Sequence, residues 1–286
     1  MKIILCEVKK NKLLVQPIEE SNYNPREIVT ALSPERLRPY LLFTPGTDEK
    51  DALMPYDIVQ RLSSMLFLPL HYLEVTLRNR IHDVLRTHYE WRGKKYKELG
   101  KPEEWLLWMP RKEFLRKKIN KAYYHARRNT KKGCTVNMGD VIAGLSFGVW
   151  IDVLKEHPSQ ASHYHFWKFT QNKIFPNATG ETRDTICREL VEIKKIRNRL
   201  FYYKTIWNFE GIKNCHMGLS EILSKYDRIM RAIRWISKDM YIFLEEGGQQ
   251  YFLGEQTLML SDALLKIFRN NSNSISADST KNRTKQ

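Results

Sequence analysis

Apolar residues recur every three or four positions through most of this chain, which is the pattern of helices that each bury one face. The longest such stretch runs from about residue 55 to 88. Pro69 lies inside it and predicts a kink or a break, because proline interrupts the helical hydrogen bonds. The apolar stripe of this stretch contains Leu66, Leu70, Leu73, Leu77, Ile81 and Val84. A second strong helix is predicted over 181–201.

Shorter signals indicate where further helices lie. Ser33 followed by Pro34 predicts the start of a short helix, since serine caps a helix and proline suits its first turn. One continuous helix is predicted over 138–156. Gly144 and Gly148 lie one turn apart within it, and we expect them to admit the close approach of another backbone.

The remaining pattern divides the chain into three parts. Residues 1–27 are predicted to form an N-terminal hairpin or arm, and residues 28–268 a single helical domain. Its last helix is predicted over 220–244, with Ser220 as the cap. Residues 269–286 contain almost nothing apolar and are predicted to be a disordered tail. The chain is therefore predicted to be all-α, a helical bundle with additional helices and a basic face.

Charge adds a class of partner to this picture. The 286 residues include 48 Lys or Arg and 32 Asp or Glu, for a net charge of +16. So basic a chain attracts polyanions, either nucleic acid or an anionic membrane surface. The sequence has no apolar window of about 18 residues and no secretory signal, so we expect a cytoplasmic protein without a membrane span.

Metal and cofactor chemistry find little support in the sequence. The cysteines are scattered without metal-ligand spacing and are expected to be reduced thiols: Cys6, Cys134, Cys187 and Cys215. There is no glycine-rich phosphate loop, no HExxH and no GxSxG. We therefore expect neither a metal nor a cofactor.

The most basic stretch is 111–133, with ten Lys or Arg and one acidic residue. Its predicted RNA-binding residues are Arg116, Lys117, Lys118, Lys121, Tyr124, Arg127, Arg128, Lys131 and Lys132. A solvated helix face usually mixes both signs, whereas this one is nearly single-signed and carries rings that can stack on bases. A membrane helix fits less well because apolar positions are few. RNA is favoured over duplex DNA because no duplex-reading motif is present.

The helix over 181–201 carries an arginine–asparagine pair near its end, Arg197 and Asn198. Arg197 falls on the apolar stripe, so we expect it to face the interior or an interface; the stripe contains Ile186, Leu190, Ile193, Arg197 and Leu200. A buried guanidinium needs an acidic partner or a ligand phosphate. Two interpretations stay open: a structural salt bridge, and an anion-binding arginine in a cleft. Asn198 is placed to cap the helix or to bond a ribose or base.

A polar stripe in the long helix contains Glu74, Arg78 and His82, each four residues from the next. Glu74 and Arg78 are placed to form a structural ion pair, and Glu74 is also a candidate partner for Arg197 from a neighbouring helix. Such a stripe is more often structural than catalytic. Arg78 and His82 nevertheless remain candidates for a catalytic role.

Several segments in order along the chain resemble one protein family. They are ALSPERLRPYL, YLEVTLRNRIHDVL, VIAGLSFGVWIDVL, the IFP turn and IRNRLFYYKTIWN, within roughly residues 28 to 245. Together they resemble the abortive-infection (Abi) proteins of bacteria, of the AbiF/AbiD type, in the HEPN superfamily. The resemblance implies an all-α HEPN-like bundle, usually paired as a homodimer, and a role in anti-phage defence through RNA cleavage.

The family motif reads Arg-Asn-x-x-x-His, followed by a second His and then Glu-Pro. By this resemblance the Arg and Asn fall on Arg197 and Asn198, and the catalytic His falls on Tyr202. The second His falls on Tyr203, and Glu-Pro on Lys204-Thr205, so the chain departs from the pattern at all four of these positions. Metal-independent RNA cleavage needs groups that exchange protons near neutral pH, as histidine does. A tyrosine hydroxyl ordinarily ionises only at about pH 10.

Three hypotheses follow. The leading one is an Abi-type HEPN protein that binds RNA around Arg197, with Tyr203 and Lys204 among the contacts, through a degenerate ribonuclease motif. The resemblance implies a small structured non-coding RNA as the partner. The alternative is an active metal-independent endoribonuclease toxin that cleaves RNA on phage infection, in which Arg78 and His82, or an activated Tyr202, act. The third is a protein-binding defence regulator.

Overall fold

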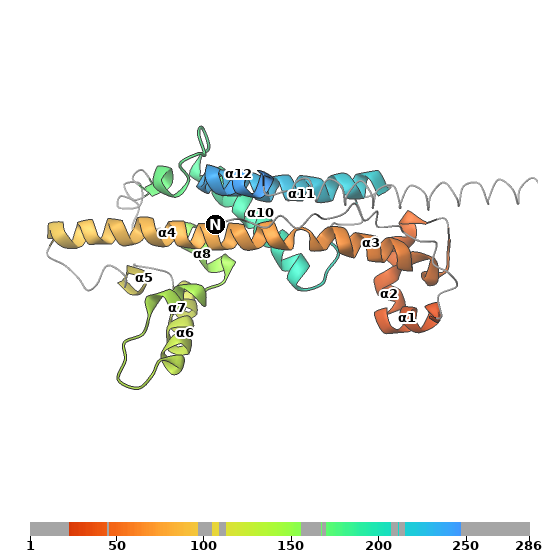
Figure 1. Cartoon of the computed structure of the whole chain (residues 1–286), viewed down its shortest axis with the longest axis horizontal. Helices are drawn as coiled ribbons and strands as arrows, with labels where there is room; N and C mark the ends of the chain where they lie inside the picture. Colours follow the sequence, from red (N-terminus) through yellow and green to blue (C-terminus); the bar gives the residue numbers. More distant parts are fainter. Residues whose placement is uncertain are drawn as a thin grey trace, which may run out of the picture.

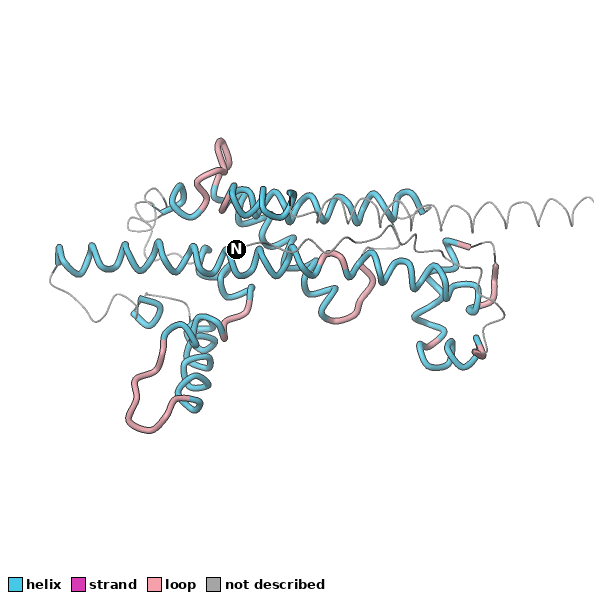
Figure 2. Tube along the Cα trace, in the orientation of Figure 1, coloured by secondary structure: helices cyan, strands magenta, loops and turns pink. Residues whose placement is uncertain are grey.

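The computed structural model describes residues 23–44, 46–96, 105–108, 113–155, 167, 170–206, 211 and 215–246. Every regular element in these ranges is a helix, and no strand occurs among them (Figure 2), so the prediction of an all-α chain is confirmed. The predicted tail over 269–286 and most of the predicted arm lie outside the described residues. The helical part begins with α1 (Pro25–Leu32), so the boundary predicted after residue 27 falls inside a helix.

Four helices form the centre of the molecule: α4 (Phe67–Tyr96), α8 (Phe147–Lys155), α10 (Arg183–Phe201) and α11 (Cys215–Ile236). With 30 residues α4 is about 45 Å long, and α11 lies along it (Figure 1). α10 packs against α4, α8 and α11. Different sides of α10 therefore face different helices, so its charged side chains can line more than one pocket.

The predicted stripe of α4 supplies much of the core. Leu66, just before α4, and Leu70, Leu73, Leu77 and Ile81 within it are at most 4% exposed. Val84 is half-buried and Leu85 takes the next buried position. The predicted break is confirmed, but it falls ahead of the proline: α3 (Leu53–Ser64) ends at Ser64 and a turn precedes α4. Pro69 lies in the first turn of α4, where its missing N–H has no helical partner to lose.

The single helix predicted over 138–156 is wrong, because the structure has two helices there. α7 (Met138–Ala143) packs on α6 (Glu113–Asn129), whereas α8 packs on α4 and α10, so the break lets each helix follow its own neighbours. The two glycines do not admit another backbone. A Cβ at Gly148 would meet the Lys194 side chain at 3.4 Å, and one at Gly144 would meet carbonyls of its own helix.

The start predicted at Ser220 is also wrong. α11 begins at Cys215, and Ser220 lies inside it. The capping serine is Ser237, between α11 and α12 (Lys238–Glu246), whose Oγ accepts a hydrogen bond from the Met240 N–H at 3.1 Å.

Two short connections fix the ends of the bundle. The predicted cap at Ser33 is confirmed, since its Oγ accepts from the Arg36 N–H and begins α2 (Pro34–Leu37), which continues as η1 (Arg38–Phe43). At the far end, Asn177 donates from its backbone and side chain to the carbonyls of Trp235 and Arg234, each at 3.1 Å. These carbonyls belong to the last turn of α11, where no helical donor reaches them.

The shorter helices complete the described chain. η2 (Glu49–Ala52) precedes α3, and α5 (Trp105–Trp108) lies against α4 with Trp105 and Leu106 fully buried. None of the described helices has both the length and the apolar character that crossing a bilayer requires.

Candidate nucleic-acid interface

Arg197 lies at the edge of the α10 core stripe. Ile186, Leu190, Ile193 and Leu200 are buried, as their spacing predicts, while the Arg197 side chain keeps 25% of its surface exposed. Its Nε lies 3.8 Å from Glu74 Oε2 across the α4–α10 contact. Glu74 is the acidic residue of a neighbouring helix that was a candidate partner for Arg197. The guanidinium carbon lies 4.0 Å from the centre of the Phe201 ring, a cation–π distance.

These contacts leave part of the guanidinium unused. The Arg197 Nε is buried and donates no hydrogen bond within the described ranges, and the bond from Nη1 to Asn198 Oδ1 is long, at 3.5 Å. A saturated structural salt bridge would show shorter, paired hydrogen bonds. Arg197 is therefore held in place by Glu74 and Phe201 while donors remain for a ligand.

A pocket of about 530 Å³ opens beside this arginine, between the first turns of α4 and the end of α10. It is lined by Phe67, Leu68, Leu70, His71, Glu74, Val75, Arg78, Arg197 and Phe201. Arg78 resembles Arg197 in this respect, since its Nε is buried and has no hydrogen-bond partner among the described residues. Of the charged residues that the structure describes here, two guanidinium groups thus face one carboxylate, an excess of positive charge that suits an anion. We call this the Arg197 pocket.

The polar stripe of α4 is divided by the structure. Glu74 and Arg78 line the Arg197 pocket, and the ion pair of Glu74 is with Arg197 rather than with Arg78. His82 is not among the residues that line this pocket; its Nδ1 accepts a hydrogen bond from Trp105 Nε1–H at 2.9 Å. The contact lets His82 help to hold α5 on α4.

His71 is the pocket residue that the sequence analysis missed. It precedes Glu74 by three positions and Arg78 by seven, so the three side chains share one face of α4. The three- and four-residue spacing of His71, Glu74 and Arg78 is visible in the sequence, but the apolar stripe from Leu66 to Ile81 is the stronger pattern there. An exposed imidazole beside two arginines brings into the pocket a ring whose nitrogens can accept or donate a proton.

α10 ends in a Schellman motif that places both tyrosines of the sequence motif on the surface. The Lys204 N–H bonds to the Arg199 carbonyl at 2.8 Å, and the Tyr203 N–H to the Leu200 carbonyl at 3.0 Å. The motif needs a left-handed residue, usually glycine, and here Tyr203 adopts it with φ of 53°. Tyr202 and Tyr203 are 69% and 76% exposed, directly after Phe201 of the Arg197 pocket.

The N-terminal helices hold this turn. Arg36 Nη1 donates to the Tyr203 carbonyl at 3.0 Å, and the buried Tyr40 hydroxyl bonds with the Thr205 side chain. Burial raises the pKa of the Tyr40 hydroxyl, although its hydrogen bonds to Thr205 and Gln60 oppose the shift. From the α10 side, Arg199 Nε donates a hydrogen bond to the Thr205 carbonyl at 2.7 Å. The strained tyrosine is thus fixed by contacts on both sides.

Replacing Tyr203 with glycine is expected to stabilise the fold by about 0.5 kcal/mol. Relief of the left-handed strain gains about 1–2 kcal/mol, and the greater freedom of glycine in the unfolded chain offsets part of it. The exposed ring contributes little packing to lose. Urea unfolding measures the change. Tyr202→Gly is the matched control, because Tyr202 is similarly exposed but has φ of −96°. Equal destabilisation by both variants would show that no strain is stored at Tyr203.

The second basic surface is α6. Leu115, Ile119 and Ala126 are buried on one side, and α6 packs against α7 and α8 below the bundle in Figure 1, on the side away from α11. Tyr124 is 65% exposed on the other side, with its ring edge-on to Tyr123. Most of the basic stretch 111–133 is thus helical, and no residue of α6 lines the Arg197 pocket.

The predicted basic residues of this stretch fall into two groups. Three have partners: Lys117 pairs with Glu113, Lys118 with Asp152, and Arg127 Nη1 donates to the Cys134 carbonyl at 2.8 Å. The other five are exposed and have no ion pair or hydrogen bond in the described part of the chain: Arg116, Lys121, Arg128, Lys131 and Lys132. This second group supplies the positive charge that is available to contact RNA.

Comparisons of the chain with protein families, with curated proteins and with solved structures found no match. Within the described residues Cys134 and Cys187 are free thiols, and no three His, Cys, Asp or Glu side chains gather as a metal site requires.

Proposed function

We propose that this chain is an RNA-binding protein in which the Arg197 pocket holds an RNA phosphate. The observation that carries the proposal is the pair of guanidinium groups, Arg78 and Arg197. They line one pocket with a single carboxylate among the described residues, and neither buried Nε has a hydrogen bond there. Arginine binds phosphate through paired, planar N–H donors, and an anion in the pocket would offset the charge of both guanidinium groups.

RNA suits the surrounding surface better than other polyanions do. Tyr202 and Tyr203 stand exposed beside the pocket, and exposed rings stack on the unpaired bases that RNA offers. The free cations of α6 add long-range attraction to a second stretch of backbone. Lys204 follows the tyrosines and is exposed as well.

As a class, we propose an Abi-type HEPN protein of bacterial anti-phage defence, acting in the cytoplasm as a homodimer. The support is the ordered resemblance across the chain and the position of Arg197 and Asn198 at the end of a bundle helix. A small structured non-coding RNA is the proposed partner. The degenerate motif, with Tyr202 in the histidine position, favours binding over cleavage.

A second candidate function, metal-independent endoribonuclease, is favoured by His71. This imidazole lines the pocket that contains Arg78 and Arg197. It could accept the 2′-hydroxyl proton while an arginine stabilises the charge that develops on the phosphate. The candidate thus has a specific base, distinct from Tyr202 and His82.

Gel retardation of mixed RNAs without metal tests the proposal. The protein is expected to retain RNA intact, with an affinity that falls steeply as salt rises, because basic sites release counterions on binding. Tyr202→Phe is expected to bind equally well, since it keeps the stacking ring. Failure to retain any RNA at about 150 mM salt would overturn the proposal.

The same reactions test the second candidate. RNA cleavage that is lost in His71→Ala and kept in His82→Gln would assign the reaction to the Arg197 pocket. Loss in His82→Gln alone would move it to the α4–α5 contact. Intact RNA after long incubation with the unmodified protein rules the nuclease out.

A further inference from the structure

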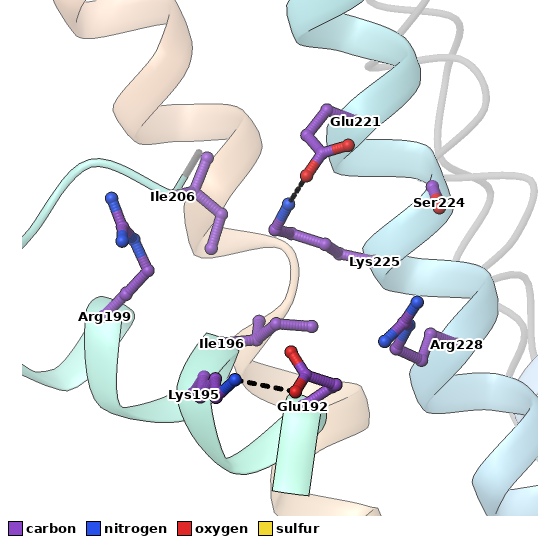
Figure 3. Close-up of a pocket in the computed structure, with 9 residues that line it drawn as sticks. All are labelled: Glu192, Lys195, Ile196, Arg199, Ile206, Glu221, Ser224, Lys225 and Arg228. Carbon is purple, nitrogen blue, oxygen red and sulfur yellow. Dashed lines mark hydrogen bonds and ion pairs between the residues drawn. The ribbon is translucent and has the colours of Figure 1, made fainter. Parts of the chain in front are cut away.

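A second pocket lies on the opposite side of the α10 end, between α10 and α11. Its volume is about 290 Å³, close to the lower limit of ordinary small-ligand sites. Residues of α10, of α11 and of the segment after Tyr203 line it (Figure 3). Cations outnumber carboxylates there: Lys195, Arg199, Lys225 and Arg228 face Glu192 and Glu221. We call this the α10–α11 pocket.

Lys225 is the residue that points to a ligand. Its side chain is only 13% exposed, and Figure 3 shows it extending from α11 into the space between the helices. Its ammonium has three donors, and in the described part of the chain its one partner is the Glu221 carboxylate of its own helix, itself 46% exposed. Among the described residues the ammonium therefore keeps two unused donors, which an acceptor entering the pocket would satisfy.

The other residues that line the α10–α11 pocket indicate the chemical class of the ligand that carries the acceptor. Arg228 points into the same space, and its pair with Glu189 is long, at 3.5 Å. Ile196 and Ile206 are buried and form an apolar wall. Cations next to an apolar wall suit a phosphate joined to a flat, partly apolar ring, and the Glu192 carboxylate can accept from a ribose hydroxyl.

We propose that the α10–α11 pocket binds one nucleoside monophosphate, with the phosphate on Lys225 and Arg228 and the base against Ile196 and Ile206. The nucleotide is either free or one unit of a bound RNA; only the second source rests on the proposed function. In that case the last turns of α10 contact RNA on both sides, through Arg197 and through this pocket.

Calorimetric titration of the full chain with adenosine 5′-monophosphate tests the inference. Saturable binding is expected, with adenosine weaker by about tenfold because the charge-assisted hydrogen bonds are lost. Lys225→Met keeps the aliphatic stem and is expected to weaken the nucleotide by about tenfold. Glu221→Gln removes the competing carboxylate and is expected to strengthen it by about threefold.

Arg61→Met is the matched control, because Arg61 pairs with Asp57 at the same i,i+4 spacing on α3 and lines neither pocket. It should bind the nucleotide like the unmodified protein. Thermal unfolding checks that each variant is folded. If Lys225→Met does not fold, the tighter nucleotide binding expected of Glu221→Gln still tests the inference. Equal affinities of Lys225→Met and Arg61→Met, or no saturable binding, overturn the inference.

A short RNA oligonucleotide then separates the two sources. Displacement of the mononucleotide by RNA identifies the pocket as part of the RNA site, whereas no displacement identifies a free nucleotide as the ligand. If RNA is retained through Arg197 and no mononucleotide binds, this inference fails and the proposed function stands. If the mononucleotide binds through Lys225 and no RNA is retained, the proposed function fails and the inference stands.

Discussion

Reversing four free charges of the basic helix region, with Arg116, Lys121, Arg128 and Lys132 all changed to glutamate, is expected to weaken RNA binding by at least about a hundredfold at 150 mM salt. These side chains are exposed and have no partner among the described residues, so the change costs no ion pair of the fold. If each meets one phosphate of single-stranded RNA, the slope of log affinity against log salt should fall by about 3. Filter binding at several salt concentrations measures both quantities.

The chain provides a matched control for this variant. Its segment 269–286 also contains four basic residues: Arg269, Lys281, Arg283 and Lys285. Changing them to glutamate lowers the net charge from +16 to +8, as the α6 variant does. A local RNA surface predicts a much smaller loss for this control. Equal losses in the two variants would mean that overall charge, and not the α6 surface, attracts the RNA.

The existence of the main helices followed from the sequence, because burial of one face imposes the three- and four-residue spacing seen in α4 and α10. The ends of the helices were less predictable from the sequence than their existence. The break near Gly144 depends on α7 and α8 having different neighbours, which lie far away in the sequence. The sequence offers two cap residues near the start of α11, Asn214 directly before Cys215 and Ser220, and local chemistry alone did not choose between them.

The candidate site was predictable to a similar extent. The position of Arg197 on an apolar stripe predicted a partly buried guanidinium, and Glu74 was one of its two proposed partners. The bond from Trp105 to His82 was not predictable, because it joins segments whose distance only the fold sets. Lys225 gave no signal either, since an intrahelical Glu–Lys pair is ordinarily exposed and adds little.

Replacing Arg197 with alanine is expected to weaken RNA binding by about tenfold to a hundredfold, as loss of a charged hydrogen-bond donor to phosphate does. Arg197→Lys is expected to recover only part of the affinity, because an ammonium lacks the planar pair of donors and the stacking on Phe201. Arg188→Ala is the control on the same helix: Arg188 is exposed and lines neither the Arg197 pocket nor the α10–α11 pocket. Fluorescence anisotropy with a labelled RNA measures the series.

The double variant Arg197→Ala/Glu74→Gln separates binding from folding. Arg197→Ala leaves the half-buried Glu74 carboxylate without its partner, so it is expected to destabilise the fold by about 1–2 kcal/mol. Neutralising Glu74 should restore most of that stability in urea unfolding, yet leave RNA binding well below that of the unmodified protein, because the Arg197 donors for phosphate are still missing. Full recovery of RNA binding in the double variant would show instead that Arg197 acts only as a structural partner of Glu74.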